Sequence, residues 1–315
     1  MSDRRAEVLA AVGAMERVAT DAALHALARR VRARIESHAS VAVAVIGRRG
    51  AGKTSLVDAL AGATSAASGA TVRARNAPSL GVILLDAPGF RGREVAWPQI
   101  ASELLAWTPA ATLFVCSATE VDALGDDLAL LSDFLRAQPA PRRCVVAVNK
   151  VDELDPVDVH LPPFLHPRKG FHIAEACARA RMNLSRRGVT SIDVVPVSAL
   201  VVRDGGRVLH DGRWNVDRVG DALRSVAAEC GALGRLALRA DVRALARAWA
   251  NYASTRRSSA EREAGITVLS RLVGRDARDP GWSRPVLAAL RGDALHRLAR
   301  TSPDLGWIEG QRTGS

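Results

Sequence analysis

Short apolar runs alternate with segments of helical periodicity through the middle of this chain. Strand character is found near residues 41–46, 70–75, 80–85, 112–116, 144–148 and 192–197, and apolar residues recur at helical spacing near 54–61, 97–107, 122–137, 170–186 and 217–230. Strands that alternate with helices predict an α/β fold, with a mainly parallel sheet and helices on both of its faces. In such a sheet, ligands bind at the carboxyl ends of the strands.

Helical patterns also occupy both ends of the chain. Residues 3–38 show one amphipathic pattern, which predicts a single long helix. After Cys230 the strand signals stop, and apolar stripes predict helices at roughly 230–256, 259–274 and 284–300. These patterns predict the following segments: an N-terminal helix (1–39), an α/β domain (40–230), a C-terminal helical region (231–305) and a loose tail (306–315).

Two segments interrupt the alternation of strands and helices. The segment 155–169 contains four prolines, which predict an irregular loop. Residues 201–214 carry Asp204-Gly205-Gly206 between two apolar stretches, which predicts a β-hairpin. This hairpin directly follows a strand, so it is placed near a ligand at the strand end. Three roles stay open for it: it covers the ligand, it meets a partner, or it has neither role.

The first strand leads into a glycine-rich loop that is typical of phosphate binding. The segment from Gly47 to Thr54 reads G-x-x-x-x-G-K-T, and it lies between the strand 41–46 and the helix 54–61. Glycines let backbone N–H groups close around phosphates, and the helix N-terminus adds partial positive charge. We expect Lys53 to reach the β- and γ-phosphates and the Thr54 hydroxyl to bind Mg²⁺.

A second polar segment follows the strand near 80–85. Asp86-Ala87-Pro88-Gly89 has a carboxylate at the strand end, where it is placed to hold Mg²⁺ through a water. The Gly89 amide is placed to sense a γ-phosphate, since glycine permits close approach of the backbone.

Asn149-Lys150-Val151-Asp152 follows the strand near 144–148 and indicates which base is bound. A carboxylate at Asp152 can accept two parallel hydrogen bonds, from N1–H and the N2 amino group of guanine. Adenine offers no such pair of donors, so the site should reject it strongly. Ser198-Ala199-Leu200 follows the last predicted strand, and the Ala199 N–H is expected to bond the guanine O6.

Lysine usage supports this interpretation. The chain has 44 basic residues, but the only lysines are Lys53, Lys150 and Lys169. The compact ammonium of Lys53 suits a phosphate cradle better than a planar guanidinium does. At Lys150, the slim aliphatic stem is expected to lie along the base plane.

Composition excludes several other classes of protein. A hydrophobic content of 48% and a charged content of 24% are globular values, and no apolar run is long enough for a transmembrane helix. The N-terminus lacks an apolar signal core, so a cytoplasmic location is expected. The scattered cysteines predict reduced core thiols rather than a metal site; they are Cys116, Cys144, Cys177 and Cys230. Three histidines near the proline-rich loop predict a solvated segment; they are His160, His166 and His172.

The formal net charge of +11 is concentrated toward the C-terminus. Residues 235–315 contain 15 arginines and 8 acidic residues, a net charge of +7. This excess is consistent with an acidic partner, such as lipid head groups or RNA, and equally with a solvated helix surface.

The four motifs together resemble the translation-factor class of P-loop GTPases, and within it the dynamin-like and Era-like branches. The resemblance covers about residues 40–230. It implies binding of GTP and GDP with Mg²⁺, and in-line attack of water on the γ-phosphate. In dynamin-like proteins an N-terminal helix packs with helices after the GTPase domain as a neck bundle, and residues 3–38 and 217–300 are placed to do the same. The chain is too short for a long stalk and membrane paddle.

The resemblance, together with the motifs, implies the following site. The nucleotide-binding residues are Gly47, Gly50, Ala51, Gly52, Lys53, Thr54, Ser55, Asp86, Gly89, Asn149, Lys150, Asp152, Ser198, Ala199 and Leu200. The catalytic residues are Lys53, Thr54, Arg49 and Thr71, and the metal ligands are Thr54, Asp86 and Thr71.

The chain departs from the family pattern at three places. Phe90 follows Gly89, so no glutamine there orients the water. Arg49 stands where dynamins carry a catalytic glutamine, and we expect it to contact phosphate in cis or across a dimer. The switch-I threonine is either Thr71 or Thr64, and a shortened switch I implies slow intrinsic hydrolysis that depends on self-association.

Three functional hypotheses follow. The first is a GTP-hydrolysing dynamin-like switch that forms a homodimer across its nucleotide face, cytoplasmic or peripheral at an anionic membrane. The second is an Era-like GTPase whose basic C-terminal helices bind ribosomal RNA, although no Gly-x-x-Gly loop of the KH type occurs there. The third is a GTP sensor that does not hydrolyse its nucleotide.

Overall fold

A computed structural model of the chain describes residues 9, 12–13, 15–16, 21–37, 41–62, 71–89, 97–138, 143–157, 166–189, 192–204 and 207–255. The predicted helices near 259–274 and 284–300 and the predicted tail lie outside these residues, as do Thr64, Phe90 and His160. By their contacts the residues form two compact units, Ser37–Gly234 and a helical unit of Met1–Glu36 with Arg235–Ser315.

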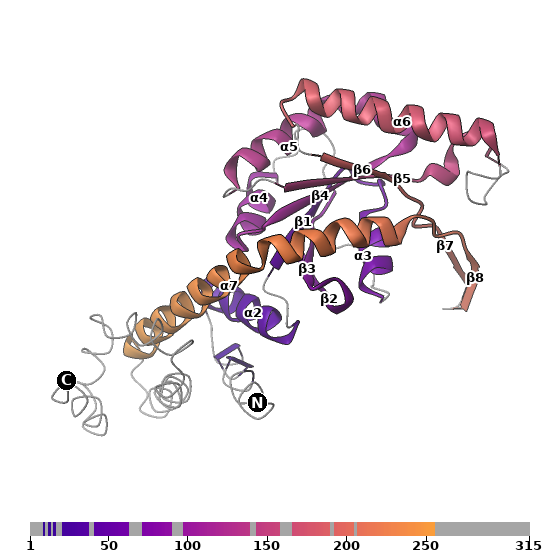
Figure 1. Cartoon of the computed structure of the whole chain (residues 1–315). Coiled ribbons are helices and arrows are strands. Elements are labelled where there is room, and N and C mark those ends of the chain that lie inside the picture. Colours follow the sequence, from indigo (N-terminus) through magenta and orange to yellow (C-terminus); the bar gives the residue numbers. More distant parts are fainter. Residues whose placement is uncertain are drawn as a thin grey trace. The chain divides into compact units, whose positions relative to one another are not determined.

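The unit Ser37–Gly234 is an α/β domain built on a six-stranded sheet (Figure 1). The strands are β1 (Val41–Ile46), β2 (Arg73–Ala77), β3 (Val82–Asp86), β4 (Ala111–Ser117), β5 (Arg143–Asn149) and β6 (Ile192–Pro196). Their order is β2-β3-β1-β4-β5-β6, and every neighbouring pair is parallel except β2 and β3. The predicted fold class is therefore confirmed.

Helices cover both faces of the sheet because its central strands β1, β3 and β4 are buried on both sides. In β1, Ala42, Ala44 and Ile46 pack into one core, while Val41, Val43 and Val45 pack into the other. The first core is covered by α4, α5 and α6 and the second by α3 and the start of α7 (Figure 1). The helices are α3 (Lys53–Ala61), α4 (Trp97–Ala106), α5 (Gly125–Ala137), α6 (Pro167–Arg186) and α7 (Val216–Thr255).

Short elements lie in the connections between these helices and strands. Three short 3-10 helices are described: η1 (Pro78–Leu80), η2 (Ala118–Ala123) and η3 (Val151–Glu153). The predicted hairpin is present as β7 (Val201–Asp204) and β8 (Arg207–Asp211), which pair antiparallel, while Gly205 and Gly206 of its turn lie outside the described residues.

The prediction of one helix over residues 3–38 is wrong, because a new helix, α2 (Ala22–Glu36), begins after Asp21. The Asp21 Oδ1 accepts hydrogen bonds from the backbone N–H groups of Ala23 at 2.8 Å and Leu24 at 3.0 Å. These two donors have no partner inside the helix, so an aspartate here starts it. Periodicity alone overlooked this cap.

A second difference concerns α7. The sequence predicts one helix near 217–230 and another near 230–256, but a single helix runs from Val216 to Thr255. Its apolar positions continue through Cys230, so nothing in the pattern ends the first helix there.

The helical unit draws α2 and the later part of α7 together through buried charges. Arg34 is 2% exposed, and its Nε donates to Asp241 Oδ2 at 3.1 Å. Arg30 Nη2 lies 2.9 Å from Asp241 Oδ1. Burial lowers the pKa of Arg34, and Asp241 opposes that effect. Two arginines on one carboxylate therefore join segments from opposite ends of the chain.

The four cysteines are free, buried thiols, as predicted. Burial raises the pKa of Cys116 and that of Cys144 to about 12, so both stay protonated and unreactive. Within the described residues, no cluster of three or more histidine, cysteine or acidic side chains is placed to hold a metal. No helix in that part of the chain is long and apolar enough to cross a bilayer.

Candidate nucleotide-binding site

The glycine-rich loop joins β1 to α3 at the carboxyl edge of the sheet. Gly50 and Gly52 adopt φ values of 87° and 83°, in the left-handed region that favours glycine. At Gly52 a Cβ would lie only 2.2 Å from Asn149 Nδ2, and at Gly47 it would lie 2.1 Å from Val115 O. The loop is therefore packed so tightly against its neighbours that side chains are excluded there.

Lys53 lies at the start of α3 and is 6% exposed. Its Nζ donates to Gly47 O and to Arg48 O, both at 3.0 Å, so the ammonium is held inside the loop it belongs to. Burial lowers the pKa of Lys53 to about 8, while the charges of Asp86 and Asp127 oppose that shift. An anionic ligand would stabilise the charged form and raise this pKa again.

Nucleotide affinity is therefore expected to depend on pH. Below the Lys53 pKa of about 8, the free protein already carries the ammonium, and the dissociation constant for GDP should be constant. Above it, binding must take up a proton, so affinity should fall by up to about tenfold per pH unit. Titration calorimetry from about pH 6.5 to about pH 9 measures this.

The control is Lys53→Arg, whose charge does not titrate in this range. It should bind more weakly and with no slope above pH 8. A flat profile for the unmodified protein would show that the Lys53 ammonium makes no contribution to phosphate binding.

Two adjacent arginines in the loop have different surroundings. Arg48 Nε donates to Asp127 Oδ2 at 2.9 Å, and Arg48 Nη2 donates to Ala123 O at 2.7 Å. Asp127, on α5, is fully buried; burial raises its pKa, and Arg48 opposes that shift. Arg49 is exposed, and its side chain makes no hydrogen bond or ion pair with the described residues. Arg48 anchors the loop to α5, a role that the sequence did not indicate.

The predicted metal ligands Thr54 and Asp86 are brought together. Thr54 Oγ1 donates to Asp86 Oδ2 at 2.9 Å. Asp86 Oδ1 is buried and has no hydrogen-bond partner among the described residues, and burial raises the Asp86 pKa. A hydroxyl and a buried carboxylate with an unpartnered oxygen are hard oxygen donors that suit Mg²⁺ or its bound water. These residues therefore fit the cation that the motifs imply.

Thr71, the third predicted metal ligand, lies just before β2 and is exposed. In the described residues, no hydrogen bond joins it to Thr54 or Asp86. The antiparallel register pairs Arg73 with Asp86, so the chain entering β2 passes beside the metal corner. This register favours Thr71 as the third ligand, and its role stays a prediction.

Gly89 lies against the phosphate loop. A Cβ at this position would lie 2.5 Å from Arg49 Cα and 2.8 Å from Lys53 Nζ. Only a glycine lets the Asp86–Gly89 segment approach the loop this closely. Its predicted contact with a γ-phosphate is consistent with this proximity and stays a prediction.

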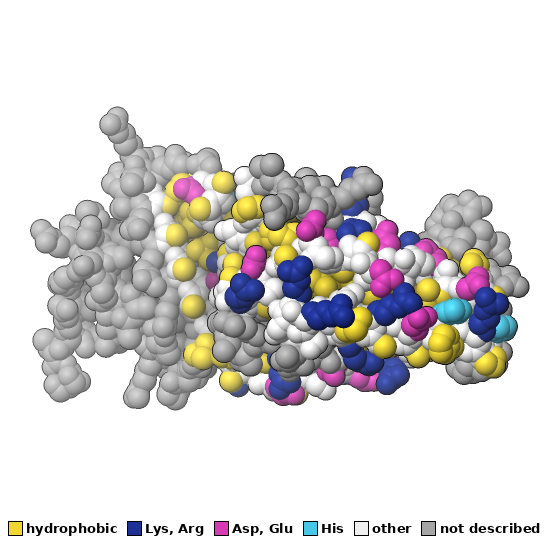
Figure 2. All heavy atoms as spheres, turned by 90° about the horizontal axis from the view of Figure 1, so that it is seen from above, with side chains coloured by type: hydrophobic (Ala, Val, Ile, Leu, Met, Phe, Trp, Pro, Cys, Tyr) yellow, Lys and Arg dark blue, Asp and Glu magenta, His cyan; other side chains and the backbone are white. Residues whose placement is uncertain are grey.

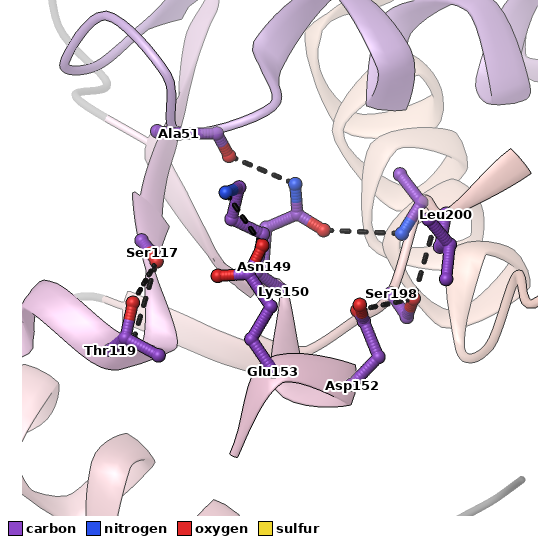
Figure 3. Close-up of polar contacts among 10 residues, drawn as sticks. Ala51, Ser117, Thr119, Asn149, Lys150, Asp152, Glu153, Ser198 and Leu200 are labelled. Atoms are coloured by element: carbon purple, nitrogen blue, oxygen red, sulfur yellow. Dashed lines mark hydrogen bonds and ion pairs between the residues drawn. The ribbon is translucent and has the colours of Figure 1, made fainter. Parts of the chain in front are cut away.

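Asn149 connects the phosphate loop with the Ser198-Ala199-Leu200 segment (Figure 3). Its Nδ2 donates to Ala51 O at 2.9 Å, and its Oδ1 accepts from Ala199 N at 3.2 Å. The Ala199 N–H, predicted to bind guanine O6, is thus engaged by a long bond that a base oxygen has to share or replace. Asn149 is 2% exposed, so one buried amide sets the spacing between the two binding segments.

The Asp152 carboxylate is oriented by a neighbouring hydroxyl. Ser198 Oγ donates to Asp152 Oδ1 at 2.7 Å and accepts from Leu200 N at 3.3 Å (Figure 3). Lys150 takes a left-handed φ of 64° and pairs with Glu153 at 2.7 Å. The residues predicted to read the base therefore lie together at the ends of β5 and β6.

These segments line one cavity of about 740 Å³. Its walls include Gly52 and Ser55 at the phosphate loop, Asp152 at the base-reading segment, and Arg213, which follows the hairpin. The sequence did not indicate Arg213. The end of the hairpin is attached to the same wall, because Gly212 N donates to Leu200 O at 3.0 Å and Ser198 and Trp214 exchange two backbone bonds.

One family model matches part of this domain. Residues 42–150 match the model described as 50S ribosome-binding GTPase. The α/β domain, with this match, is consistent with a P-loop GTPase domain. Of the guanine-reading residues, the match includes Asn149 and Lys150 and ends just before Asp152. The match therefore supports binding of guanine nucleotide by this domain.

Solved structures resemble the GTPase domain only distantly. A variant of SsGBP is 18% identical, with 68% of this chain and 66% of that chain covered and a TM-score of 0.43. A GTP-binding protein from the hyperthermophilic archaeon Sulfolobus solfataricus in complex with GDP is 18% identical, with 72% and 66% covered and a TM-score of 0.41. A variant of Era from Aquifex aeolicus bound to GDP and AlF4− is 21% identical, with 59% and 56% covered and a TM-score of 0.38.

The chain spans about 66% of the length of the SsGBP structures that it matches. No curated protein matches the sequence. At these levels of similarity, the GTPase domain does not identify a branch of the superfamily.

Proposed function

We propose that this protein binds GTP with Mg²⁺, hydrolyses it slowly to GDP and phosphate, and acts as a dynamin-like switch that self-associates across its nucleotide face. The observation that carries nucleotide binding is the Asn149 amide, which joins the phosphate loop to the guanine-reading segments through two hydrogen bonds. Such a bridge fixes the distance between the two segments, as binding of one ligand to both of them requires.

The proposed hydrolysis depends on positioning rather than on a covalent intermediate. Lys53 and the backbone N–H groups of the loop would hold the phosphates, and Gly89, which lies against Lys53, would contact the terminal one. Thr54 and Asp86 would hold Mg²⁺, which would supply positive charge to neutralise the charge that develops on the phosphates. No side chain of the motifs serves as a general base, since Phe90 follows Gly89. This absence supports slow turnover in the isolated protein.

Self-association is supported by the exposed Arg49 at the tip of the phosphate loop. Because Arg48 is anchored to Asp127 and Arg49 has no such contact, only Arg49 can turn toward phosphate or toward a second copy. The helical unit supports the dynamin-like interpretation, since it joins the two ends of the chain through Arg30, Arg34 and Asp241. A neck bundle would use such a contact between an N-terminal helix and a helix that follows the GTPase domain.

Arg49→Ala is expected to abolish stimulated hydrolysis. An arginine that stabilises the transition state contributes about 10³–10⁵ in rate, so turnover should fall by at least ~10²-fold while GDP affinity stays within about twofold. Phosphate release measured against protein concentration tests this. If Arg49 acts across a dimer, the concentration-dependent part of the rate disappears; if it acts in cis, the rate falls at every concentration.

The matched control is Arg136→Ala, since the Arg136 side chain is 68% exposed on α5. Unchanged turnover in Arg49→Ala at all concentrations would rule out a catalytic role. Single-turnover hydrolysis near zero in the unmodified protein, combined with tight GTP binding, would instead select a sensor that does not hydrolyse GTP.

An anionic membrane surface is the proposed partner, because residues 235–315 carry a net charge of +7. The face that α6 covers is mixed in charge: Figure 2 shows basic and acidic side chains together there, and Arg179 pairs with Asp122 and Glu175. Turnover is expected to rise on liposomes that contain anionic lipid and not on neutral ones. No rise on either kind would exclude the membrane.

Ribosome association is the second candidate, favoured by the match of residues 42–150 to the 50S ribosome-binding GTPase model. It predicts that the protein sediments with large ribosomal subunits and dissociates as salt is raised. If the protein sediments with ribosomal subunits at low salt in the presence of either GTP or GDP, and liposomes do not change its turnover, this candidate would replace the first one.

A further inference from the structure

We propose that Lys169 positions the guanine-reading carboxylate of Asp152 and thereby sets the selectivity of the site for guanine. This inference rests on the proposed binding of guanine nucleotide. Lys169 belongs to none of the four motifs, and it lies 17 residues after Asp152, in the first turn of α6.

Lys169 contacts the main chain of the base-reading segment directly. Its Nζ donates to Asp152 O at 2.7 Å and to Pro156 O at 3.2 Å. The residue is 2% exposed, so its long side chain is packed inside the domain and its ammonium is directed at these two carbonyls. The ammonium, which extends from α6, thus joins the carbonyls of Asp152 and Pro156 in the turn that carries Asp152.

The position is unfavourable for a cation unless the carbonyls compensate. Burial removes water from the ammonium, which is costly without several hydrogen bonds. The N-terminus of a helix carries partial positive charge, so the start of α6 does not attract a cation. A chain in which almost every basic residue is arginine has nevertheless kept a lysine here. A compact ammonium can serve two convergent carbonyls in a narrow space, and a planar guanidinium needs a wider one.

Two restraints therefore act on Asp152, one on its side chain and one on its backbone. Ser198 Oγ holds the carboxylate at 2.7 Å, and Lys169 holds the carbonyl of the same residue at 2.7 Å. The pair of parallel hydrogen bonds to guanine N1–H and N2 requires the carboxylate in one orientation. Releasing the backbone restraint should weaken these two bonds and leave the contacts of the phosphate loop unchanged.

The test compares GDP with IDP, which lacks the N2 amino group that Asp152 is expected to bind. In the unmodified protein, the affinity ratio of GDP to IDP measures the contribution of that hydrogen bond. Lys169→Met is expected to lower GDP affinity about tenfold or more and to reduce the GDP-to-IDP ratio at least threefold, since each good hydrogen bond contributes roughly this much. A purely structural role of Lys169 would lower both affinities equally and leave the ratio unchanged, which would overturn the proposal.

The matched control is Arg168→Met, because the neighbouring Arg168 side chain is 67% exposed and pairs only at the surface with Asp155, at 3.2 Å. It should change neither affinity. If Lys169→Met does not fold by circular dichroism, Lys169→Arg carries the same comparison, since it keeps the charge and changes the geometry.

The outcomes also separate this inference from the proposed function. A wild-type protein that binds neither GDP nor IDP would refute guanine-nucleotide binding. A wild-type protein that prefers GDP, with a Lys169 variant that keeps the same ratio, would refute only the role of Lys169.

Discussion

Asp152→Asn is expected to change the base preference of the site from guanine to xanthine. The substitution replaces one acceptor oxygen with an amide that donates, so guanine N2 and this amide would present hydrogens to each other. Xanthine carries a carbonyl oxygen at the same ring position and can accept from the new amide. Sites built to hydrogen-bond a particular group discriminate by about 10⁴-fold, so the ratio of GDP to XDP affinity should fall by roughly 10³-fold or more.

The fold of this variant is expected to be intact. The new amide keeps an oxygen that can accept a hydrogen bond from the Ser198 hydroxyl, whose Oγ lies 2.7 Å from Asp152 Oδ1. Competition binding with GDP and XDP measures the ratio. Asp155→Asn is the matched control, since this nearby carboxylate is 62% exposed and pairs with Arg168 outside the cavity. Unchanged preference in Asp152→Asn would mean that the base is read elsewhere.

Gly52→Ala is expected to weaken nucleotide binding severely. Its Cβ would lie 2.2 Å from Asn149 Nδ2, a distance that real contacts do not reach, so the amide has to move. Asn149 cannot move without breaking its bonds to Ala51 O and Ala199 N. One methyl group would therefore disturb the phosphate loop and the base-reading segment together. We expect GDP affinity to fall by more than about 10²-fold, since two buried hydrogen bonds are lost.

Gly188→Ala separates the steric effect from backbone strain. Gly188 also takes a left-handed φ, of 76°, but a Cβ there would meet nothing within 4 Å. This control should cost roughly 1–2 kcal/mol in the free energy of unfolding, because a non-glycine residue takes that conformation at a cost, and it should bind GDP normally. Thermal unfolding and GDP titration on both variants distinguish the two causes. Equal GDP affinity in the two variants would show that the contact between Gly52 and Asn149 is unimportant.

The secondary structure of the α/β domain was largely readable from the sequence. Because β1, β3, β4 and β5 are buried on both faces, they appear in the sequence as nearly continuous apolar runs. The helices show a period of about 3.6 residues, so the local pattern was sufficient to tell strands from helices. It failed where a local pattern has two interpretations. The amphipathic period of residues 3–38 continues across Asp21, and only the cap geometry shows that a helix begins there. Asp21 itself is the local signal for this helix start, since aspartate is a preferred N-cap residue.

The candidate site was predictable where its chemistry is contiguous in the chain. Lys53 and Thr54 follow the loop glycines directly, and Asp152 follows Asn149 closely, so short motifs include them. The supporting contacts were not predictable in this way. Arg48 and Asp127 are 79 residues apart, and Asn149 and Ala51 are 98 apart. No motif marks Lys169 or Arg213, since their roles depend on how α6 and the hairpin are placed against the guanine-reading segments.

The sequence by itself determined the class of the domain, the order of its strands and helices, and the residues that we expect to meet a guanine nucleotide. It did so because periodicity and phosphate-binding motifs are properties of neighbouring residues. Only the tertiary structure decided which of two adjacent arginines is anchored, which amide joins the two halves of the cavity, and which buried lysine holds Asp152. Those outcomes depend on side-chain directions and on contacts between distant segments, which the packing of helices on the sheet creates.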